Sequence, residues 1–301
     1  MRSHLSDSCP PAGIIFWRQP RQMALVTRQA ATCALVEWRT TGHNENLRTS
    51  MNITSAGIPL ESPLTLDRSE VHLWRLNLET VAGTAEEWGS ALSGDEQKRA
   101  ARFHHARDRK CFTATRSALR QILGAYLKVD PKLLSFTYSD KEKPSLAGPE
   151  AASGIEFNVS HSGTLALLAF ARGRMVGVDV EQTKRDIDTM AIAARFFSEA
   201  EKKKLASLPA DQRTGAFFLC WTRKEAYIKA TGKGLSLPLR QFDVSMTPSD
   251  QNALLATRPD PLERNRWSMR DIPVPAGYAA ALCVSGMDWR LVDTGAQEYG
   301  V

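Results

Sequence analysis

The sequence predicts an α+β protein of two similar halves, each with helices packed on a mainly antiparallel sheet. Short alternating or apolar runs, typical of strands, are separated by turns marked with glycine and proline. Segments with helical spacing and capping signals occur both before and after about Arg172. A chain of 301 residues, 43% of them hydrophobic, is long enough for roughly one to three units with cores of their own.

We expect four segments along the chain. Residues 1–68 form an N-terminal extension, 69–173 an N-terminal lobe, 174–290 a C-terminal lobe with the metal site, and 291–301 a tail. Up to Met51 the extension is rich in arginine, lacks lysine and shows no strand or helix period. This pattern fits a transit peptide, a disordered tail or translated sequence upstream of a true start at Met51. We favour the last two and leave the region out of fold reasoning.

The first half is expected to combine two helices with a set of strands. Ser93 and Glu96 form a capping-box pattern that starts a basic helix running to about His104. A second helix follows and ends at the break Asp130-Pro131. Strands are expected at residues 71–76, 134–138, 155–160 and 165–171.

The second half is expected to begin with a strand over residues 175–181. Ser198 and Glu201 form another capping-box pattern, and an amphipathic helix through residues 217–228 ends near Gly232. Further strands are expected at residues 241–246, 266–272 and 278–284.

Charge and composition narrow the setting. The net charge of +6 favours an anionic partner, such as nucleic acid, lipid headgroups, a polyphosphate ligand or an acidic protein. No stretch approaches the roughly 20 apolar residues of a membrane helix, and no secretory signal is visible. The five cysteines lie far apart, without a disulfide or metal-pair spacing. We therefore expect a cytoplasmic protein that does not act on membranes.

The segment Gly177–Glu181 is the strongest local signal. In a strand, Asp179 and Glu181 point to one side while the valines between them point to the core. Two neighbouring carboxylates repel unless a cation lies between them, and hard oxygen ligands suit Mg²⁺. The ordinary alternative is a solvated strand edge.

A second signal lies in the helical segment Trp221–Ala230. Glu225 and Lys229 are four residues apart and share a helix face. The ordinary interpretation is a surface ion pair of little energetic value. Because apolar residues surround Glu225, we expect it to be partly buried, with Lys229 or a metal as its partner.

Two weaker signals precede these motifs. Asn158–Gly163 places short polar side chains and a histidine at a strand end, which fits an anion-binding corner, although a histidine in a turn is more often structural. Lys141–Pro144 is a basic turn of the kind that is usually solvated.

Taken together, these motifs resemble the 4′-phosphopantetheinyl transferase superfamily, in its larger, two-lobed surfactin-synthetase type. The resemblance covers about residues 70–285, and the strand motif combined with the helix motif makes it specific. It rests on Lys143-Pro144, Phe157–Ser162, Gly177–Glu181, Arg195–Ser198, Trp221–Lys229 and Gly232–Leu235.

The resemblance implies a pseudo-twofold α+β fold with coenzyme A bound between the lobes. It implies transfer of the 4′-phosphopantetheine arm to a serine of an apo acyl or peptidyl carrier protein, with release of 3′,5′-ADP. Asp179, Glu181 and Glu225 would hold Mg²⁺, or alternatively Mn²⁺, beside the coenzyme A diphosphate. Glu225 would help to deprotonate the carrier serine, and Lys229 would stabilise the leaving group.

The resemblance also implies contacts to coenzyme A. Ser160 and His161 would meet the adenosine phosphate, and Lys143 would add a phosphate contact. The basic helix around Arg99, with Arg116, would bind coenzyme A or meet an acidic carrier. We expect a monomer, and fatty-acid, polyketide, nonribosomal-peptide and aminoadipate pathways all stay open.

Two positions depart from the family pattern. Glu142 stands before Lys143 where relatives often have glycine, and Cys111 stands where they often have a basic residue. Neither change touches the three carboxylates.

Three alternatives remain. Another Mg²⁺-dependent phosphotransferase would be expected to carry a glycine-rich phosphate loop, which is not seen. A basic nucleic-acid-binding module would interleave aromatic and basic residues on one face, whereas the aromatics here mostly occupy apolar positions, so we expect no nucleic-acid partner. A non-catalytic family member is disfavoured by the intact carboxylates and Lys229.

Overall fold

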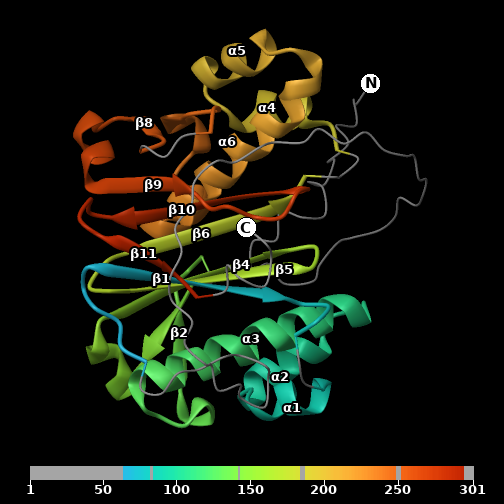
Figure 1. Cartoon of the computed structure of the whole chain (residues 1–301), viewed down its shortest axis with the longest axis vertical. Coiled ribbons are helices and arrows are strands. Elements are labelled where there is room, and N and C mark those ends of the chain that lie inside the picture. Colours follow the sequence, from blue (N-terminus) through green and yellow to red (C-terminus); the bar gives the residue numbers. More distant parts are fainter. Residues whose placement is uncertain (1–63, 82–83, 142, 184–186, 249–251, 295–301) are drawn as a thin grey trace, which may run out of the picture.

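The computed structural model describes residues 64–81, 84–141, 143–183, 187–248 and 252–294 (Figure 1). Most of the expected N-terminal extension, residue Glu142 and the end of the expected tail therefore lie outside the described residues. Within the described ranges, no helix is both long and apolar enough to cross a lipid bilayer.

The first half of the chain builds a four-stranded sheet covered by helices on its outer face. The strand order is β11-β1-β5-β4, with β1, β5 and β4 antiparallel and β11 parallel to β1. Its elements are β1 (Glu70–Asn77), α1 (Ala85–Ser90), α2 (Gly94–Ala101), α3 (Ala106–Leu127), the hairpin β2 (Ser135–Tyr138) and β3 (Pro144–Ala147), β4 (Ile155–Ser162) and β5 (Leu165–Arg172), joined by β11 (Arg290–Asp293) from the far end of the chain.

The second half builds a three-stranded antiparallel sheet of order β6-β10-β9, again with helices outside. Its elements are β6 (Val176–Gln182), α4 (Thr189–Phe196), α5 (Glu199–Ser207), α6 (Ala210–Thr231), the hairpin β7 (Phe242–Val244) and β8 (Leu254–Thr257), β9 (Trp267–Asp271) and β10 (Tyr278–Ser285). Short 3₁₀ helices lie at Pro131–Leu133, Gly148–Ser153, Gly234–Ser236, Leu239–Gln241 and Pro261–Arg266.

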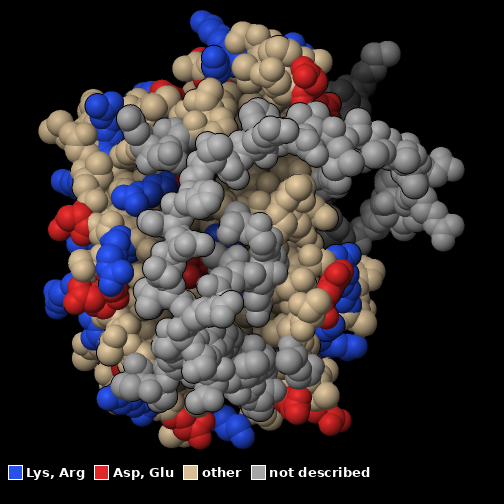
Figure 2. All heavy atoms as spheres, viewed as in Figure 1, with Lys and Arg blue, Asp and Glu red and all other residues tan. Residues whose placement is uncertain are grey.

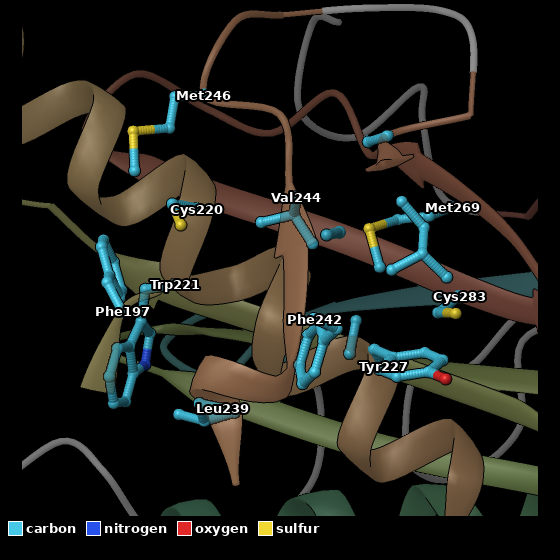
Figure 3. Packing of buried hydrophobic residues seen from close by; sticks show 14 of the residues in the cluster. Phe197, Cys220, Trp221, Tyr227, Leu239, Phe242, Val244, Met246, Met269 and Cys283 are labelled. Atoms are coloured by element: carbon cyan, nitrogen blue, oxygen red, sulfur yellow. The ribbon is translucent and has the colours of Figure 1, made fainter. Parts of the chain in front are cut away.

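The layers follow from the side-chain alternation of the strands. In Figure 1 the two sheets lie between helices α1–α3 on one side and α4–α6 on the other. One apolar cluster joins α3 to the first sheet, a second fills the space between the sheets, and a third joins α6 to the second sheet. Figure 3 shows this third cluster, in which Trp221 and Tyr227 of α6 pack near Phe197 and Phe242. The predicted α+β class is confirmed.

The predicted helix signals hold at both capping boxes. The Glu96 carboxylate accepts the backbone N–H of Ser93 at 3.0 Å, and the Glu201 carboxylate accepts that of Ser198 at 2.8 Å. The first basic helix is shorter than expected, because α2 ends at Ala101 and a turn separates it from α3.

Several expectations about strands need correction. The expected tail contains β11, which pairs with β1, so Arg290–Asp293 belongs to the first sheet. Strands β3 and β8 were not predicted, and β3 begins at Pro144, inside the segment that was expected to be a turn. The polar face of β4 is not solvated, since Asn158, Ser160 and Ser162 are at most 7% exposed and lie against β6.

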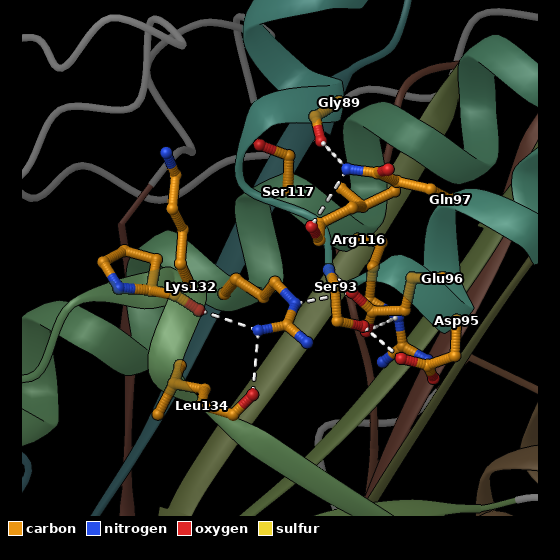
Figure 4. A network of polar contacts seen from close by, with 12 residues as sticks. Gly89, Ser93, Asp95, Glu96, Gln97, Arg116, Ser117, Lys132 and Leu134 are labelled. Carbon is orange, nitrogen blue, oxygen red and sulfur yellow. Dashed lines mark hydrogen bonds and ion pairs between the residues drawn. The ribbon is translucent and has the colours of Figure 1, made fainter.

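Each half also contains a buried glutamate held by a cation from its long helix. Glu96 lies 3.1 Å from Arg116 Nε and 2.6 Å from Arg120 Nε, and Figure 4 shows this network around the start of α2. In the second half, Lys224 Nζ lies 2.8 Å from Glu201. All of these side chains are at most 3% exposed, so each pair anchors a short helix to a long one inside the protein.

Charged side chains are mixed over the surface. On the face in Figure 2, lysine and arginine alternate with aspartate and glutamate over both halves, and no continuous basic stripe is formed by the described residues in view.

Candidate active site

Strand β6 carries two of the predicted carboxylates, and its alternation is as expected. Val176, Val178 and Val180 belong to the apolar cluster between the sheets. Asp179 and Glu181 therefore point to the opposite face, toward α6, and are only 3% and 6% exposed. The two carboxylates are buried, which excludes the solvated strand edge.

Helix α6 lies very close to β6 at Gly177. A Cβ placed on Gly177 would overlap backbone atoms of Ala226 and Ala230. Because glycine has no side chain, the backbones of strand and helix touch here. This contact brings the neighbouring α6 side chains, Glu225 and Lys229, over the acidic face of β6.

Lys229 makes the direct link between helix and strand. Its Nζ lies 2.6 Å from Asp179 Oδ1 and donates to Ser160 Oγ at 3.0 Å. Ser160 Oγ in turn donates to the same Asp179 oxygen at 2.9 Å. The sequence analysis placed all three residues in the site, and the structure joins them in one polar network.

Glu225 lies in the same buried region, and no lysine or arginine of the described ranges forms an ion pair with it. It is 5% exposed, and its Oε1 has no hydrogen-bond partner among the described residues. Burial raises the pKa of Glu225 to about 8, and the charges of Asp179 and Glu181 push it in the same direction while Lys229 opposes them. The expected burial of Glu225 is confirmed, and its pKa shows that the other carboxylates lie near it.

The chemistry of these oxygens fits a divalent metal. Asp179 Oδ2, like Glu225 Oε1, is buried without a partner among the described residues. Burial also raises the pKa of Asp179, against the opposing effect of Lys229. Within the described ranges, no three acidic, histidine or cysteine side chains are gathered closely enough to hold a metal as they stand. The Lys229 ammonium is instead the cation that neutralises Asp179.

The Asn158–Ser162 motif does not form a free anion-binding corner. Asn158, Ser160 and Ser162 accept backbone N–H groups of β6 through their side chains. Ser162 Oγ also donates to Glu181 Oε2 at 3.0 Å. This face of β4 therefore supports the carboxylate strand.

His161 points to the other side of β4 from these serines. Burial lowers the pKa of His161 to about 4, and the nearby Lys229 ammonium adds to the effect while Asp108 opposes it. The imidazole is therefore neutral near pH 7, and its neighbours come from α6 and from the start of α3.

Lys143 connects the first half to the end of α6. Its Nζ donates to the backbone oxygen of Lys229 at 2.9 Å and to that of Val176 at 3.4 Å. Burial lowers the pKa of Lys143. The Lys143 side chain is thus docked beside the site rather than solvated.

Arg116 and Arg99 lie differently from the rest of the predicted set. Arg116 is 2% exposed, pairs with Glu96 and donates to the Tyr138 hydroxyl at 2.9 Å. It would have to leave this internal network to reach a ligand, so its role in the structure is to hold the first half together. Arg99 lies on α2 with its guanidinium 5.9 Å from the centre of the Phe112 ring.

Sequence reasoning missed the supporting residues of the site. No supporting role was predicted for Gly177, which begins the carboxylate motif, or for Asn158 and Ser162, which were expected to belong to an anion-binding corner. A usable signal was present: small polar residues repeat at every second position of β4, facing a strand with the same repeat of carboxylates.

Comparisons with known proteins match both halves of the chain to one family. Residues 175–283 match a family model described as the 4′-phosphopantetheinyl transferase superfamily. Residues 82–172 match a model described as 4′-phosphopantetheinyl transferase, N-terminal. Each model covers one of the two halves that carry the site.

Curated relatives match most of the chain. The 4′-phosphopantetheinyl transferase HetI of a Nostoc species is 40% identical over 233 residues, which is 77% of this chain and 95% of the relative. The 4′-phosphopantetheinyl transferase Sfp of Bacillus subtilis is 30% identical over 205 residues, 68% of this chain and 87% of the relative. A solved structure, the crystal structure of Thermotoga maritima holo-acyl-carrier-protein synthase, is 24% identical to this chain. The match covers 38% of this chain and 63% of that one, with a TM-score of 0.28.

Proposed function

This chain belongs to the 4′-phosphopantetheinyl transferase superfamily, and on that premise we propose that the β6–α6 site catalyses the transfer. The enzyme moves phosphopantetheine from coenzyme A to a carrier protein. The observation that carries the residue assignment is the buried network in which Asp179 of β6 meets Lys229 of α6, with Glu225 beside them.

The reaction is a phosphoryl transfer, in which catalysis consists largely of positioning and charge neutralisation. The oxygen of the carrier serine attacks the phosphorus that bears the pantetheine arm. The bond from that phosphorus to the oxygen of 3′,5′-ADP breaks, and the serine proton passes to a base. The site must therefore supply a base, a partner for the leaving group and a cation for the diphosphate.

Glu225 is the base in this proposal. In the metal-free protein, burial raises the pKa of Glu225, so its carboxylate is more basic than that of an exposed glutamate. It is buried beside the β6 carboxylates, so it can take the serine proton directly or through an intervening water.

Lys229 is the partner of the leaving group. Its side chain is 23% exposed while that of Asp179 is 5% exposed, so Lys229 is the more accessible member of the pair. Its ion pair with Asp179 keeps it at the site before coenzyme A binds. During transfer, its ammonium would neutralise the negative charge that develops on the departing 3′,5′-ADP oxygen.

Asp179, Glu181 and Glu225 would hold Mg²⁺, or Mn²⁺ in its place. When bound, such an ion neutralises charge on the diphosphate oxygens. Asp179 Oδ2 and Glu225 Oε1 support this assignment, because both are buried oxygens without a hydrogen-bond partner among the described residues, and such atoms are costly.

His161, Ser160 and Lys143 remain our proposed contacts for the adenosine end of coenzyme A, with Arg99 at the edge of the first half. His161 is neutral in the free protein, so a phosphate contact would use one imidazole N–H or draw a proton onto the ring. Arg116 would join this set only by leaving Glu96 and the Tyr138 hydroxyl, to which it is bound in this structure.

We further propose a cytoplasmic monomer made of two lobes, residues 69–173 and 174–290. The carrier is an acyl or peptidyl carrier protein or domain of fatty-acid, polyketide, nonribosomal-peptide or aminoadipate metabolism.

The test is intact mass spectrometry of several apo carriers incubated with the full chain, coenzyme A and Mg²⁺. A gain of one phosphopantetheine on at least one carrier is expected, and it should disappear in excess EDTA. Undiminished transfer in EDTA would contradict the metal assignment, and no transfer to any carrier would contradict the function.

A further inference from the structure

Strands β4 and β6 are edge strands of two different sheets, yet they lie side by side. They are joined by side chains of β4 and backbone N–H groups of β6 instead of by a regular backbone ladder. The acceptors are spaced two residues apart on β4, and so are the donors on β6. The bonds are Val178 N to Asn158 Oδ1 at 2.9 Å, Val180 N to Ser160 Oγ at 3.3 Å and Gln182 N to Ser162 Oγ at 3.0 Å.

This junction follows from the pairing of β6. The strand pairs with β10 along one edge, so the N–H groups of alternate residues point to the other edge, where β4 lies. Asn158, Ser160 and Ser162 share one face of β4 and are 7%, 7% and 4% exposed. In this buried setting each acceptor satisfies an N–H group that would otherwise be left unpaired at a cost.

Two of the acceptors also touch the acidic side chains. Ser160 Oγ donates to Asp179 Oδ1 at 2.9 Å, and Ser162 Oγ donates to Glu181 Oε2 at 3.0 Å. Each hydroxyl therefore accepts from the β6 backbone and donates to a β6 carboxylate. The orientation of both carboxylates depends on the register in which β6 lies against β4.

We propose that Asn158 and Ser162 are positioning residues for phosphopantetheine transfer, and this rests on the proposed function. Asn158 fixes the start of β6 through Val178, and Ser162 fixes its end through Gln182 and aims Glu181. The acidic residue between these two points is held in place from both sides. Neither residue needs to touch coenzyme A for this role.

The experiment compares Asn158→Ala and Ser162→Ala with the wild-type chain. Ser162→Thr keeps the hydroxyl and serves as the conservative variant. Ser268→Ala is the matched control, because it removes a hydroxyl from a residue 5% exposed on β9, which pairs with β10 and not with β6. Two quantities are measured on the folded fraction: amide hydrogen exchange at Val178 and Gln182, and kcat and KM for coenzyme A with a responsive carrier.

We expect each alanine variant to accelerate hydrogen exchange at its own β6 amide. Each should also lower kcat about 10- to 100-fold with little change in KM, as is typical when a residue that orients a metal-binding side chain is replaced. Ser162→Thr should recover most of kcat, and Ser268→Ala should match the wild type. If the alanine variants keep kcat within about twofold of wild type, or lose it with unchanged exchange at both amides, the proposal is wrong. Failure of the proposed function is separate, since it would appear as an inactive wild-type chain with the exchange result intact.

Discussion

The two halves of the molecule share an arrangement of sheet and long helix but differ in the side chains that lie between them. In each, a mainly antiparallel sheet places one face of its first strand against a helix of 22 residues. On β1 the side chains that face the helix are large and largely uncharged, whereas on β6 they are a glycine and two carboxylates. The two sets are His72, Trp74 and Leu76 in the first half, and Gly177, Asp179 and Glu181 in the second.

The size of these side chains decides what each helix can reach. In the first half, the Tyr126 hydroxyl of α3 meets His72 Nδ1 at 2.7 Å and accepts from Trp74 Nε1 at 3.1 Å, so aromatic groups fill the space between strand and helix. In the second half, Gly177 lets the α6 backbone touch the strand. Only this close approach allows Lys229 to reach Asp179. The second half thus forms a site where the strand and helix backbones are closest and the buried side chains between them are charged.

The anchoring of the helices is shared, by contrast. Arg120 and Lys224 occupy the same position counted from the starts of α3 and α6. Each binds a buried glutamate and also donates to a backbone oxygen near the start of the following hairpin, that of Leu134 at 2.9 Å and that of Leu239 at 2.7 Å. The halves therefore differ in their strand faces more than in their framework. The pseudo-twofold relation itself stays a prediction.

The largest expected effect is on the transfer rate, and it distinguishes a residue of α6 from the residue at the same position of α3. Glu225 and Gln121 also occupy the same position along α6 and α3. Glu225→Gln should lower the transfer rate by about 10²- to 10⁴-fold, because the base is lost, with the fold intact. Gln121→Ala, which removes a side chain bonded to Ser117, should leave the rate near wild type. Equal rates in the two variants, measured by intact mass of the carrier, would remove Glu225 from the site.

A second comparison concerns the buried anchors. Lys224→Met should destabilise the protein by about 3–5 kcal/mol, because Glu201 is left charged without its cation. Arg120→Met should cost less, since Arg116 remains 3.1 Å from Glu96. Urea unfolding of the two variants checks the order, and a larger loss for Arg120→Met would show that the two anchors are not equivalent in the way described.

A third comparison concerns the close approach. Gly177→Ala should cost about 1–3 kcal/mol of stability through overpacking and should also lower the transfer rate, as α6 is pushed away from β6. His72→Ala should lower stability without lowering the rate of the folded enzyme. Thermal unfolding and initial rates distinguish these outcomes, and a Gly177→Ala enzyme of normal rate would refute the claim that close packing builds the site.

The smallest expected effect depends on pH. The folded pKa of His161, about 4, lies below the ordinary value of 6.5, so folding favours the neutral ring. This contribution is complete above about pH 6.5 and is lost as pH falls toward 4. Between pH 8 and pH 5 the wild type should lose at most about 2 kcal/mol more stability than His161→Asn. Parallel stability curves for the two proteins would show that Lys229 and burial do not act on His161 as described.

Much of the fold and the core of the site follow from local patterns. The alternation of β6 predicted which side Asp179 would face, and the spacing of α6 predicted that Glu225 and Lys229 share a face, because both are properties of a single element. The capping boxes of α2 and α5 were predicted for the same reason.

The missed features all depend on contacts between distant elements. Nothing in the sequence near Asn158 indicates that its side chain will accept an N–H group from β6. The basic run that contains Arg116 gives no sign that this residue turns inward to Glu96. Strand β11 pairs with β1 from the opposite end of the chain, and nothing in the sequence next to either strand indicates that partner.

We propose that carboxylates from β6 and α6 close around one divalent ion, and Mn²⁺ binding followed by electron paramagnetic resonance tests whether strand and helix share it. With coenzyme A present and a coenzyme A blank subtracted, we predict that the wild-type chain binds one Mn²⁺ and that Asp179→Asn, Glu181→Gln and Glu225→Gln each weaken this binding, whereas Gln121→Ala does not. Unchanged Mn²⁺ affinity in the Glu225→Gln protein would contradict the account, because strand and helix would then not share an ion.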